Sequence, residues 1–195
     1  MDRNQHTGRK PRILILGSTG RTGKAVIAEL GQTPESSQPV YASRNREQVE
    51  AWRREGKDAV YLDLDDARTF PAALQGVDRL FLATGYTIQM VHQSKTIVDA
   101  AADAGVKFIV HLGIFGNGRM TDPHFAWHEM VERYIEGSGV SWSHIHPHFF
   151  LPFAHFGSSF PRIGSLILKN KELPMLVLSY CGQLPIWQTK DLKIL

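Results

Sequence analysis

A repeated alternation of short apolar runs with helix-forming segments is the feature that most restricts the fold of this chain. Short buried strands that alternate with helices are typical of a parallel sheet with helices on both faces. The sequence therefore predicts an α/β, doubly wound parallel sheet. The expected strands cover residues 12–16, 39–42, 59–62, 80–83, 107–112 and 141–146, and the expected helices cover 24–30, 46–54, 67–74, 88–104 and 124–136.

The composition excludes several classes of protein. Hydrophobic residues make up 43% of the chain and charged residues 21%, which is close to the globular average and argues against bulk disorder. The single cysteine, Cys181, allows neither an internal disulfide nor a zinc-type cysteine spacing. No apolar run approaches the roughly 18 residues that span a bilayer, and residues 1–12 lack an apolar signal segment. We therefore expect a soluble cytoplasmic protein that does not enter a membrane.

The basic charge of the chain is confined to its N-terminus. The whole sequence has 22 Lys and Arg against 19 Asp and Glu, and residues 1–12 hold four of the basic and one of the acidic residues. The remaining chain is neutral. Because a nucleic-acid surface needs many cationic side chains along the phosphates, the neutral body argues against a nucleic-acid partner.

A glycine-rich loop follows the first expected strand. Gly17, Gly20 and Gly23 form a G-x-x-G-x-x-G pattern between the apolar run and the next helix. The first glycine permits a tight turn, the second lets the backbone approach a pyrophosphate, and the third lets the helix pack closely on the strand. The helix N-terminus then offers N–H groups to the phosphates. This context predicts a Rossmann fold that binds a dinucleotide through Gly17, Ser18, Thr19, Gly20, Arg21, Thr22 and Gly23.

The end of the second strand indicates which dinucleotide binds. NAD sites usually place an acidic residue there for the ribose hydroxyls, whereas this chain has Arg44 followed by Arg46. Arg44 can form bidentate bonds with a 2′-phosphate, Arg21 can approach the same phosphate, and Arg46 is expected at a solvated helix start. The sequence therefore predicts that NADP(H) is preferred over NAD(H). Further cofactor contacts are expected from Asp63, Leu64, Thr84 and Gly85.

The pattern is less regular after Pro147. The helical spacing of Phe149, Phe153, Phe156 and Phe160 is interpreted as one buried helix face, and residues 184–188 resemble another strand. We expect a flexible basic tail over residues 1–11, the dinucleotide-binding Rossmann domain over 12–148, and a truncated substrate-side region over 149–195. Chain beyond residue 195, or a second subunit in a homodimer, would then complete the acceptor pocket.

Three segments resemble the NmrA-like branch of the atypical short-chain dehydrogenase/reductases. They are the glycine loop at 17–23, the approach to the fourth strand at 74–82, and the segment V-E-R-Y-I-E-G-S-G-V-S-W at 131–142. The resemblance extends over about residues 11 to 192. It implies an NAD(P)-binding reductase of quinone-like compounds, or a redox-sensing regulator without turnover.

The chain departs from the wider superfamily where catalytic residues are expected. No tyrosine is followed by a lysine four residues later, and Gly113 stands near the position of the superfamily's serine. His124 and His128 stand in the Tyr and Lys places and share one helix face. His128 can contact the cofactor ribose, and His124 can donate a proton to a reduced carbonyl or quinone oxygen. The alternative is that His124 caps the helix and that His128 is an ordinary half-buried polar residue.

A metal site is the other interpretation of the histidines. His144, His146 and His148 alternate along the sixth strand, and imidazole clusters can hold zinc. Pro147 is expected to end that strand and no acidic residue has a matching spacing, so we assign no metal. The turn at 146–148 is expected to form the nicotinamide end of the groove through its backbone.

Three functions are left open by the sequence. The first is an NADPH-dependent reductase that transfers a hydride to a quinone-like or other small carbonyl acceptor, a reaction whose difficult chemistry belongs to the nicotinamide. The second is a catalytically inactive NADP(H) sensor of the NmrA type that acts on a partner. The third is a nucleic-acid or scaffold protein that has kept only the fold, which fits the neutral body least.

Overall fold

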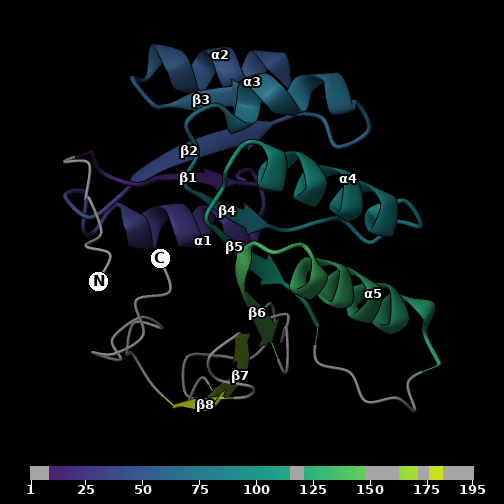
Figure 1. The fold of residues 1–195 in the computed structure, drawn as a ribbon. Helices are drawn as coiled ribbons and strands as arrows, with labels where there is room; N and C mark the ends of the chain where they lie inside the picture. The colour runs from purple at the N-terminus through teal and green to yellow at the C-terminus, as the bar shows by residue number, and fades with distance from the viewer. Residues whose placement is uncertain (1–8, 115–120, 148–162, 171–175, 182–195) are drawn as a thin grey trace, which may run out of the picture.

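One mixed sheet runs through the molecule. The computed structural model describes residues 9–114, 121–147, 163–170 and 176–181 (Figure 1). In these residues the strand order is β3-β2-β1-β4-β5-β6-β7-β8, with six parallel strands followed by two antiparallel ones. The strands are β1 (Arg12–Ile15), β2 (Gln38–Ser43), β3 (Ala59–Tyr61), β4 (Arg79–Leu82), β5 (Phe108–Leu112), β6 (Ser141–Pro147), β7 (Ile163–Asn170) and β8 (Leu176–Cys181).

The helices connect the parallel strands, as the sequence predicted. Each of the first five strands is followed by helical structure before the next strand begins. The predicted doubly wound α/β fold is therefore confirmed. The helices are α1 (Arg21–Leu30), α2 (Arg46–Arg54), the 3-10 turn η1 (Ala67–Thr69), α3 (Phe70–Leu74), α4 (Met90–Asp103) and α5 (Pro123–Gly137).

The prediction lacks the last two strands at one end of the sheet, β7 and β8. β7 pairs antiparallel with β6, and β8 pairs antiparallel with β7, so the sheet is mixed and not wholly parallel. Antiparallel edge strands on a mostly parallel sheet are common, but they add no helical segment to the alternation on which the prediction relied. The expected helix with the phenylalanines and the expected strand at 184–188 lie outside the described residues. The proposed division into tail, domain and substrate-side region stays a prediction.

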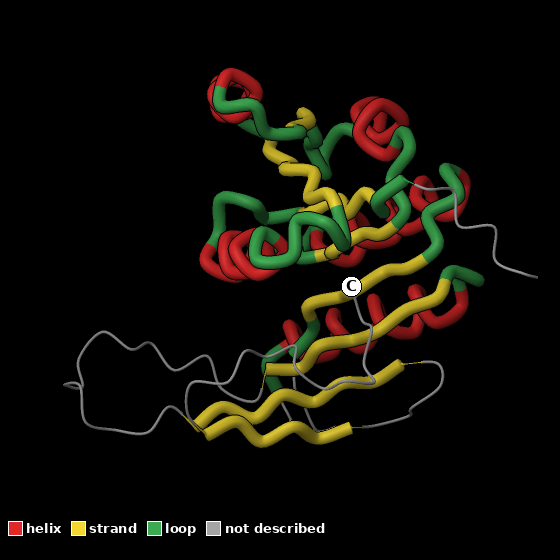
Figure 2. The backbone as a smooth tube through the Cα atoms, turned by 90° about the vertical axis from the view of Figure 1, so that its left-hand side faces the viewer, coloured by secondary structure: helices red, strands yellow, loops and turns green. Residues whose placement is uncertain are grey.

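The sheet is buried on both faces because its strands alternate between two cores. Ile13 and Ile15 pack with Val26 of α1 on one face, whereas Leu14 and Leu16 belong to the larger core on the other face. That larger core also takes apolar side chains from α3, α4 and α5. Figure 2 shows helices on both sides of the strands. The helical crossovers between β1 and β6 make these strands parallel, so their carboxyl ends lie at one edge of the sheet.

The first described residues are tied to the body of the domain. Arg9 forms an ion pair with Asp78 at 2.9 Å, and the ammonium group of Lys10 donates to the carbonyl of Pro34. Arg12 forms a further ion pair with Asp58 at 2.8 Å. Part of the predicted basic tail is thus held at the amino-terminal ends of the strands.

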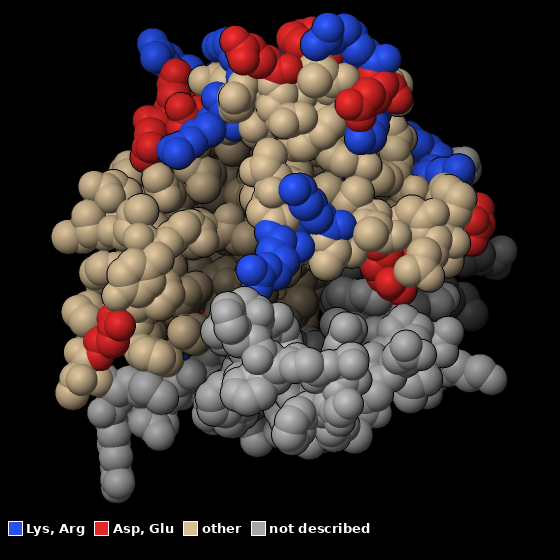
Figure 3. All heavy atoms as spheres, turned by 180° about the vertical axis from the view of Figure 1, so that it is seen from behind, with Lys and Arg blue, Asp and Glu red and all other residues tan. Residues whose placement is uncertain are grey.

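Charged side chains of both signs are mixed on the end of the molecule that α2 and its neighbours form (Figure 3). Among them are the pairs Arg53–Glu50, Lys57–Glu55 and Arg68–Asp66. Neighbouring charges of opposite sign cancel here, which agrees with the zero net charge of the sequence after residue 12. None of the described helices has both the length and the apolar character that crossing a membrane requires.

Candidate functional site

The glycine loop turns the chain sharply from β1 into α1. Gly17 has a φ of +68°, a left-handed conformation that favours glycine, and its carbonyl accepts a hydrogen bond from the Gly20 amide at 2.8 Å. A Cβ at Gly23 would lie 2.1 Å from the same carbonyl oxygen. The third glycine is therefore required for the close approach of α1 to the loop, which is the packing role that the sequence suggested.

The N-terminus of α1 suits an anion. Gly20 is the N-cap residue, no side chain caps the helix, and the first turn contains no acidic residue. The amides of a first helical turn have no partner within the helix, and the helix dipole adds partial positive charge at this end. A phosphate placed here would therefore meet free N–H donors and no opposing carboxylate, so the local chemistry fits a dinucleotide.

Ser18 differs from its neighbours in the loop. Its hydroxyl is buried, donates to the carbonyl of Ile15 at 2.7 Å and accepts from the amide of Ala42 at 3.2 Å. The side chain thus links β1 to β2 and is not directed at a ligand. Thr19 and Arg21 are exposed, and Thr22 is half-buried.

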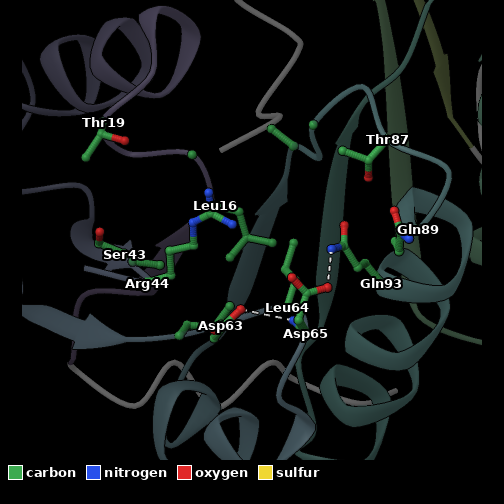
Figure 4. A pocket seen from close by; sticks show the side chains of 15 residues that line it. Leu16, Thr19, Ser43, Arg44, Asp63, Leu64, Asp65, Thr87, Gln89 and Gln93 are labelled. Atoms are coloured by element: carbon green, nitrogen blue, oxygen red, sulfur yellow. Dashed lines mark hydrogen bonds between the residues drawn. The ribbon is translucent and has the colours of Figure 1, made fainter. Parts of the chain in front are cut away.

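A cleft of about 570 Å³ opens at the carboxyl ends of the parallel strands. Figure 4 shows Thr19, Ser43 and Arg44 on one side of it, opposite Thr87, Gln89 and Gln93. Ligands of open α/β sheets bind outside the carboxyl ends of the strands, where the strand order reverses, and here that reversal lies between β1 and β4. The lining residues are Leu16, Gly17, Thr19, Ala42, Ser43, Arg44, Leu62, Asp63, Leu64, Asp65, Ala83, Gly85, Thr87, Gln89 and Gln93.

Arg44 is the cation of this cleft. Its side chain is exposed, lines the cleft, and makes no hydrogen bond or ion pair with any other described residue. Arg46, by contrast, stacks its guanidinium 3.8 Å from the centre of the Tyr61 ring. Of the two arginines after β2, Arg44 is the one available to a ligand.

A hydrogen bond between Gln93 and Asp65, two residues that line the cleft, was not predicted from the sequence. The amide of Gln93, on α4, donates to Asp65 at 2.7 Å, while Asp63 accepts from the backbone amide of Asp65 at 3.1 Å. The polar wall beside Asp63 is therefore braced by a helix that is distant in sequence. The spacing of residues in the sequence does not reveal such a contact. Leu16, Ser43 and Ala83 also line the cleft and were not predicted, although their positions at the ends of strands could have indicated it.

Thr84 and Gly85 follow β4 as predicted. Gly85 lines the cleft, whereas the Thr84 hydroxyl is buried and has no hydrogen-bond partner among the described residues. Thr84 is thus half-buried and is not among the residues that line the cleft.

His124 and His128 lie together at the start of α5, but neither is among the residues that line the cleft. Their rings are 4.6 Å apart between centroids. Burial, followed by the nearby His124, lowers the pKa of His128 to about 4, and burial also lowers the pKa of His124. The cap of α5 is the carboxylate of Asp122, which accepts from the His124 amide at 2.9 Å, so His124 is not the capping residue.

A buried row of histidines lies between α5 and the strands β5 and β6. We call it the histidine seam, and it consists of His111, His128, His144 and His146. The Nδ1 atoms of His111 and His144 are 3.3 Å apart. In the described part of the chain, no group of three or more potential ligands is arranged to hold a metal ion.

Two carboxylates of α5 face the histidine seam. His146 Nε2 lies 2.7 Å from Oε1 of Glu132, and His144 Nε2 lies 3.8 Å from Oε1 of Glu136. A Cβ at Gly113 would lie 2.9 Å from Glu132 Oε1 and equally close to the His146 ring. A side chain at the position expected for the superfamily's serine would therefore have to displace this pair.

The family of the chain follows from comparison with known proteins. The model of the NmrA-like family matches residues 9–169, which is most of the sequence. The chain belongs to the NmrA-like family. The resemblance seen in the glycine loop and in the segment at 131–142 is thereby confirmed.

Two curated relatives of this NmrA-like chain are reductases. The NAD(P)H azoreductase of Xenophilus azovorans is 30% identical over 141 residues, which are 71% of this chain and 48% of the relative. Quinone oxidoreductase 2 of Escherichia coli is 35% identical over 103 residues, which are 52% of this chain and 36% of the relative. The chain thus spans half or less of the length of these relatives.

Solved structures show the same fold. The NADPH-dependent quinone oxidoreductase of Escherichia coli, in complex with NADPH, superposes with a TM-score of 0.60 at 30% identity, over 67% of this chain and 46% of that one. The Citrobacter sp. triphenylmethane reductase, complexed with NADP(H), superposes with a TM-score of 0.61 at 24% identity, over 68% of this chain and 47% of that one. The Rossmann-type architecture is therefore shared with nicotinamide-dependent reductases.

Proposed function

We propose that this chain is the cofactor-binding part of an NADPH-dependent reductase that transfers a hydride to quinone-like or other small carbonyl acceptors. The observation that carries the proposal is that one cleft is lined both by Arg44, whose guanidinium has no hydrogen bond or ion pair among the described residues, and by the glycine loop that leads into α1. This pairing gives one cleft two separate anion sites, as a dinucleotide with an extra 2′-phosphate requires. The named activities of the azoreductase and quinone oxidoreductase relatives support the same reading.

Each predicted cofactor residue has a role in this proposal. The backbone from Gly17 to Gly23 binds the pyrophosphate, and Arg44 binds the 2′-phosphate, with Arg21 nearby. Asp63 and Leu64 flank the adenine, and the Asp65–Gln93 hydrogen bond holds that wall in place. Gly85 lies beside the path toward the nicotinamide, with Thr84 beneath it. When bound, the nicotinamide supplies the hydride.

The two histidines of α5 have unequal roles in this proposal. The His124 ring lies against the exposed side chain of Tyr86, at 4.2 Å between centroids, which places it at the molecular surface near the cleft. The neutral ring of His124 would donate a hydrogen bond from its N–H to the oxyanion that develops on the acceptor, and the proton would come from water. His128 is only 7% exposed and its ring packs against that of His124, so it acts as a positioning residue. A contact with the cofactor ribose would require the His128 side chain to reach the cleft.

Binding isotherms for NADPH, NADP⁺, NADH and NAD⁺ test the first half of the proposal. We expect NADPH to bind at least tenfold more tightly than NADH, because a charge-assisted bond to a phosphate is worth about 1.5–3 kcal/mol. Oxidation of NADPH in the presence of a quinone panel tests the second half. Tight NADPH binding without turnover of any acceptor would favour the redox-sensor function instead.

A further inference from the structure

The loop after β4 contains residues that line the cleft and, between them, two large exposed side chains. Gly85, Thr87 and Gln89 line the cleft, whereas the intervening Tyr86 and Ile88 are 65% and 73% exposed. Large apolar side chains with this exposure are usually covered or used for binding when they gather beside a cleft. The loop thus presents an aromatic surface next to the cofactor cleft.

The Tyr86 ring is held in place from two directions. Its hydroxyl lies 3.1 Å from each carboxylate oxygen of Asp122, to which it donates. Its ring packs 4.2 Å from the His124 ring and 6.3 Å from the Trp127 ring, between centroids. Trp127 is partly buried against the main core, so the cluster is anchored to α5. An exposed aromatic ring with a fixed orientation loses little entropy when a second ring stacks on it.

The rim of this surface carries negative charge. Asp122 is exposed and is the charged group hydrogen-bonded to Tyr86. Burial lowers the pKa of His124 and keeps its ring neutral at pH 7, so it does not cancel that charge. A flat ligand on Tyr86 therefore lies beside a carboxylate.

We propose that Tyr86, His124 and Trp127 form the platform on which the acceptor stacks, and that Asp122 makes this platform select uncharged or cationic planar aromatic compounds over anionic ones. The proposal rests on the proposed function, since it names the acceptor site of that same reductase. It adds a charge preference that neither the fold nor the glycine loop implies.

Calorimetric binding of a neutral 1,4-naphthoquinone, and of the same ring carrying a sulfonate, tests the platform without turnover. Titrations are made on the full chain, alone and with saturating NADP⁺. We expect the neutral ring to bind about fivefold more tightly, which corresponds to the roughly 1 kcal/mol between unit charges about 4 Å apart in water. Tyr86→Leu should weaken binding of the neutral ring about three- to tenfold, whereas Tyr86→Phe, which keeps the ring and loses only the hydrogen bond to Asp122, should weaken it less than Tyr86→Leu does.

Asp122→Asn isolates the charge. Asparagine is an equally good helix cap, so α5 should remain folded, and circular dichroism checks this. The variant should bring the sulfonated and neutral rings to equal affinity. Unchanged binding in Tyr86→Leu would overturn the platform, and an unchanged preference in Asp122→Asn would overturn the charge selection. Failure of NADPH-dependent turnover, with these titrations as expected, would count against the proposed reductase and not against the platform.

Discussion

Arg44 shows how one residue can set the choice of cofactor. It is unpartnered among the described residues and lines the cleft, whereas Arg46 is engaged with Tyr61. We predict that Arg44→Ala lowers NADPH affinity about ten- to a hundredfold and leaves NADH affinity nearly unchanged, because only NADPH carries the 2′-phosphate. Isothermal titration with both cofactors measures the difference.

Arg46→Ala is the matched control for that experiment. It removes the same charge two residues away, but from a side chain whose guanidinium already stacks on Tyr61. We expect its NADPH affinity to stay within about threefold of the parent. Equal losses in the two variants would mean that general positive charge, and not a bond from Arg44, favours NADPH.

Gly23 is a second residue where the structure makes a sharp prediction. An added Cβ would lie 2.1 Å from a backbone oxygen, which cannot move aside as a flexible side chain can. Gly23→Ala should therefore destabilise the domain by about 1–3 kcal/mol, despite the better helix propensity of alanine. Denaturant unfolding measures this change in the free energy of unfolding.

Gly137→Ala is the comparison for Gly23. Gly137 lies in the last turn of α5, and a Cβ there meets no atom within 4 Å. This variant should be neutral or about 0.5–1 kcal/mol more stable. A stability loss in Gly137→Ala equal to that in Gly23→Ala would show that the helices need glycine for reasons other than close packing.

At the scale of elements, helix and strand positions followed from local pattern, but their ends did not. The sequence predicted the first helix from residue 24, whereas α1 begins at Arg21. Its first turn contributes no large apolar side chain, so the apolar periodicity on which the prediction relied starts a turn late. β7 and β8 were missed because their place at the sheet edge depends on pairing with β6, which is tertiary information.

The packing of α5 makes the stability of the fold depend on pH. His128 and His111 are buried against each other, with ring centroids 5.4 Å apart, and burial lowers the pKa of both. Below about pH 6.5 these two histidines take up protons in the unfolded chain but stay neutral in the folded chain, so a falling pH favours unfolding. The stabilisation is present above the unfolded pKa of about 6.5 and is lost as the pH falls toward 4, and for His128 the loss is about 2 kcal/mol between pH 7.5 and pH 5.

His128→Phe tests this dependence. Phenylalanine cannot take up a proton, so the drop in unfolding free energy between pH 7.5 and pH 5 should shrink by about 2 kcal/mol. His92→Phe, at an exposed position on α4, is the control and should leave the drop unchanged. A parent protein equally stable at both pH values would contradict the neutral, buried state of His128 on which the prediction rests.

On the scale of the whole molecule, the topology explains which part of the site was predictable. Gly17, Arg44, Asp63 and Gly85 all lie within three residues of the end of a strand, and parallel strands bring those positions to one edge. The histidines could not be placed in this way. Whether His128 faces the cleft or the seam depends on how α5 packs on β5 and β6, which residue spacing leaves undetermined.

The same topology predicts that this chain binds NADPH without the additional length of its relatives. Every described residue that lines the cleft lies between Leu16 and Gln93, from the end of β1 to the first turn of α4. Because a ligand that binds only the folded state stabilises it, NADPH at a hundred times its Kd should add about 2.7 kcal/mol. For a domain of this size that raises the Tm by about 5–10 °C. Thermal unfolding with NADPH and with NADH at equal concentration measures it, and NADH should give the smaller shift. If neither cofactor raised the Tm while the unliganded protein unfolded cooperatively, then residues 16–93 would not be sufficient for the site, and the missing contacts would have to come from elsewhere in the protein.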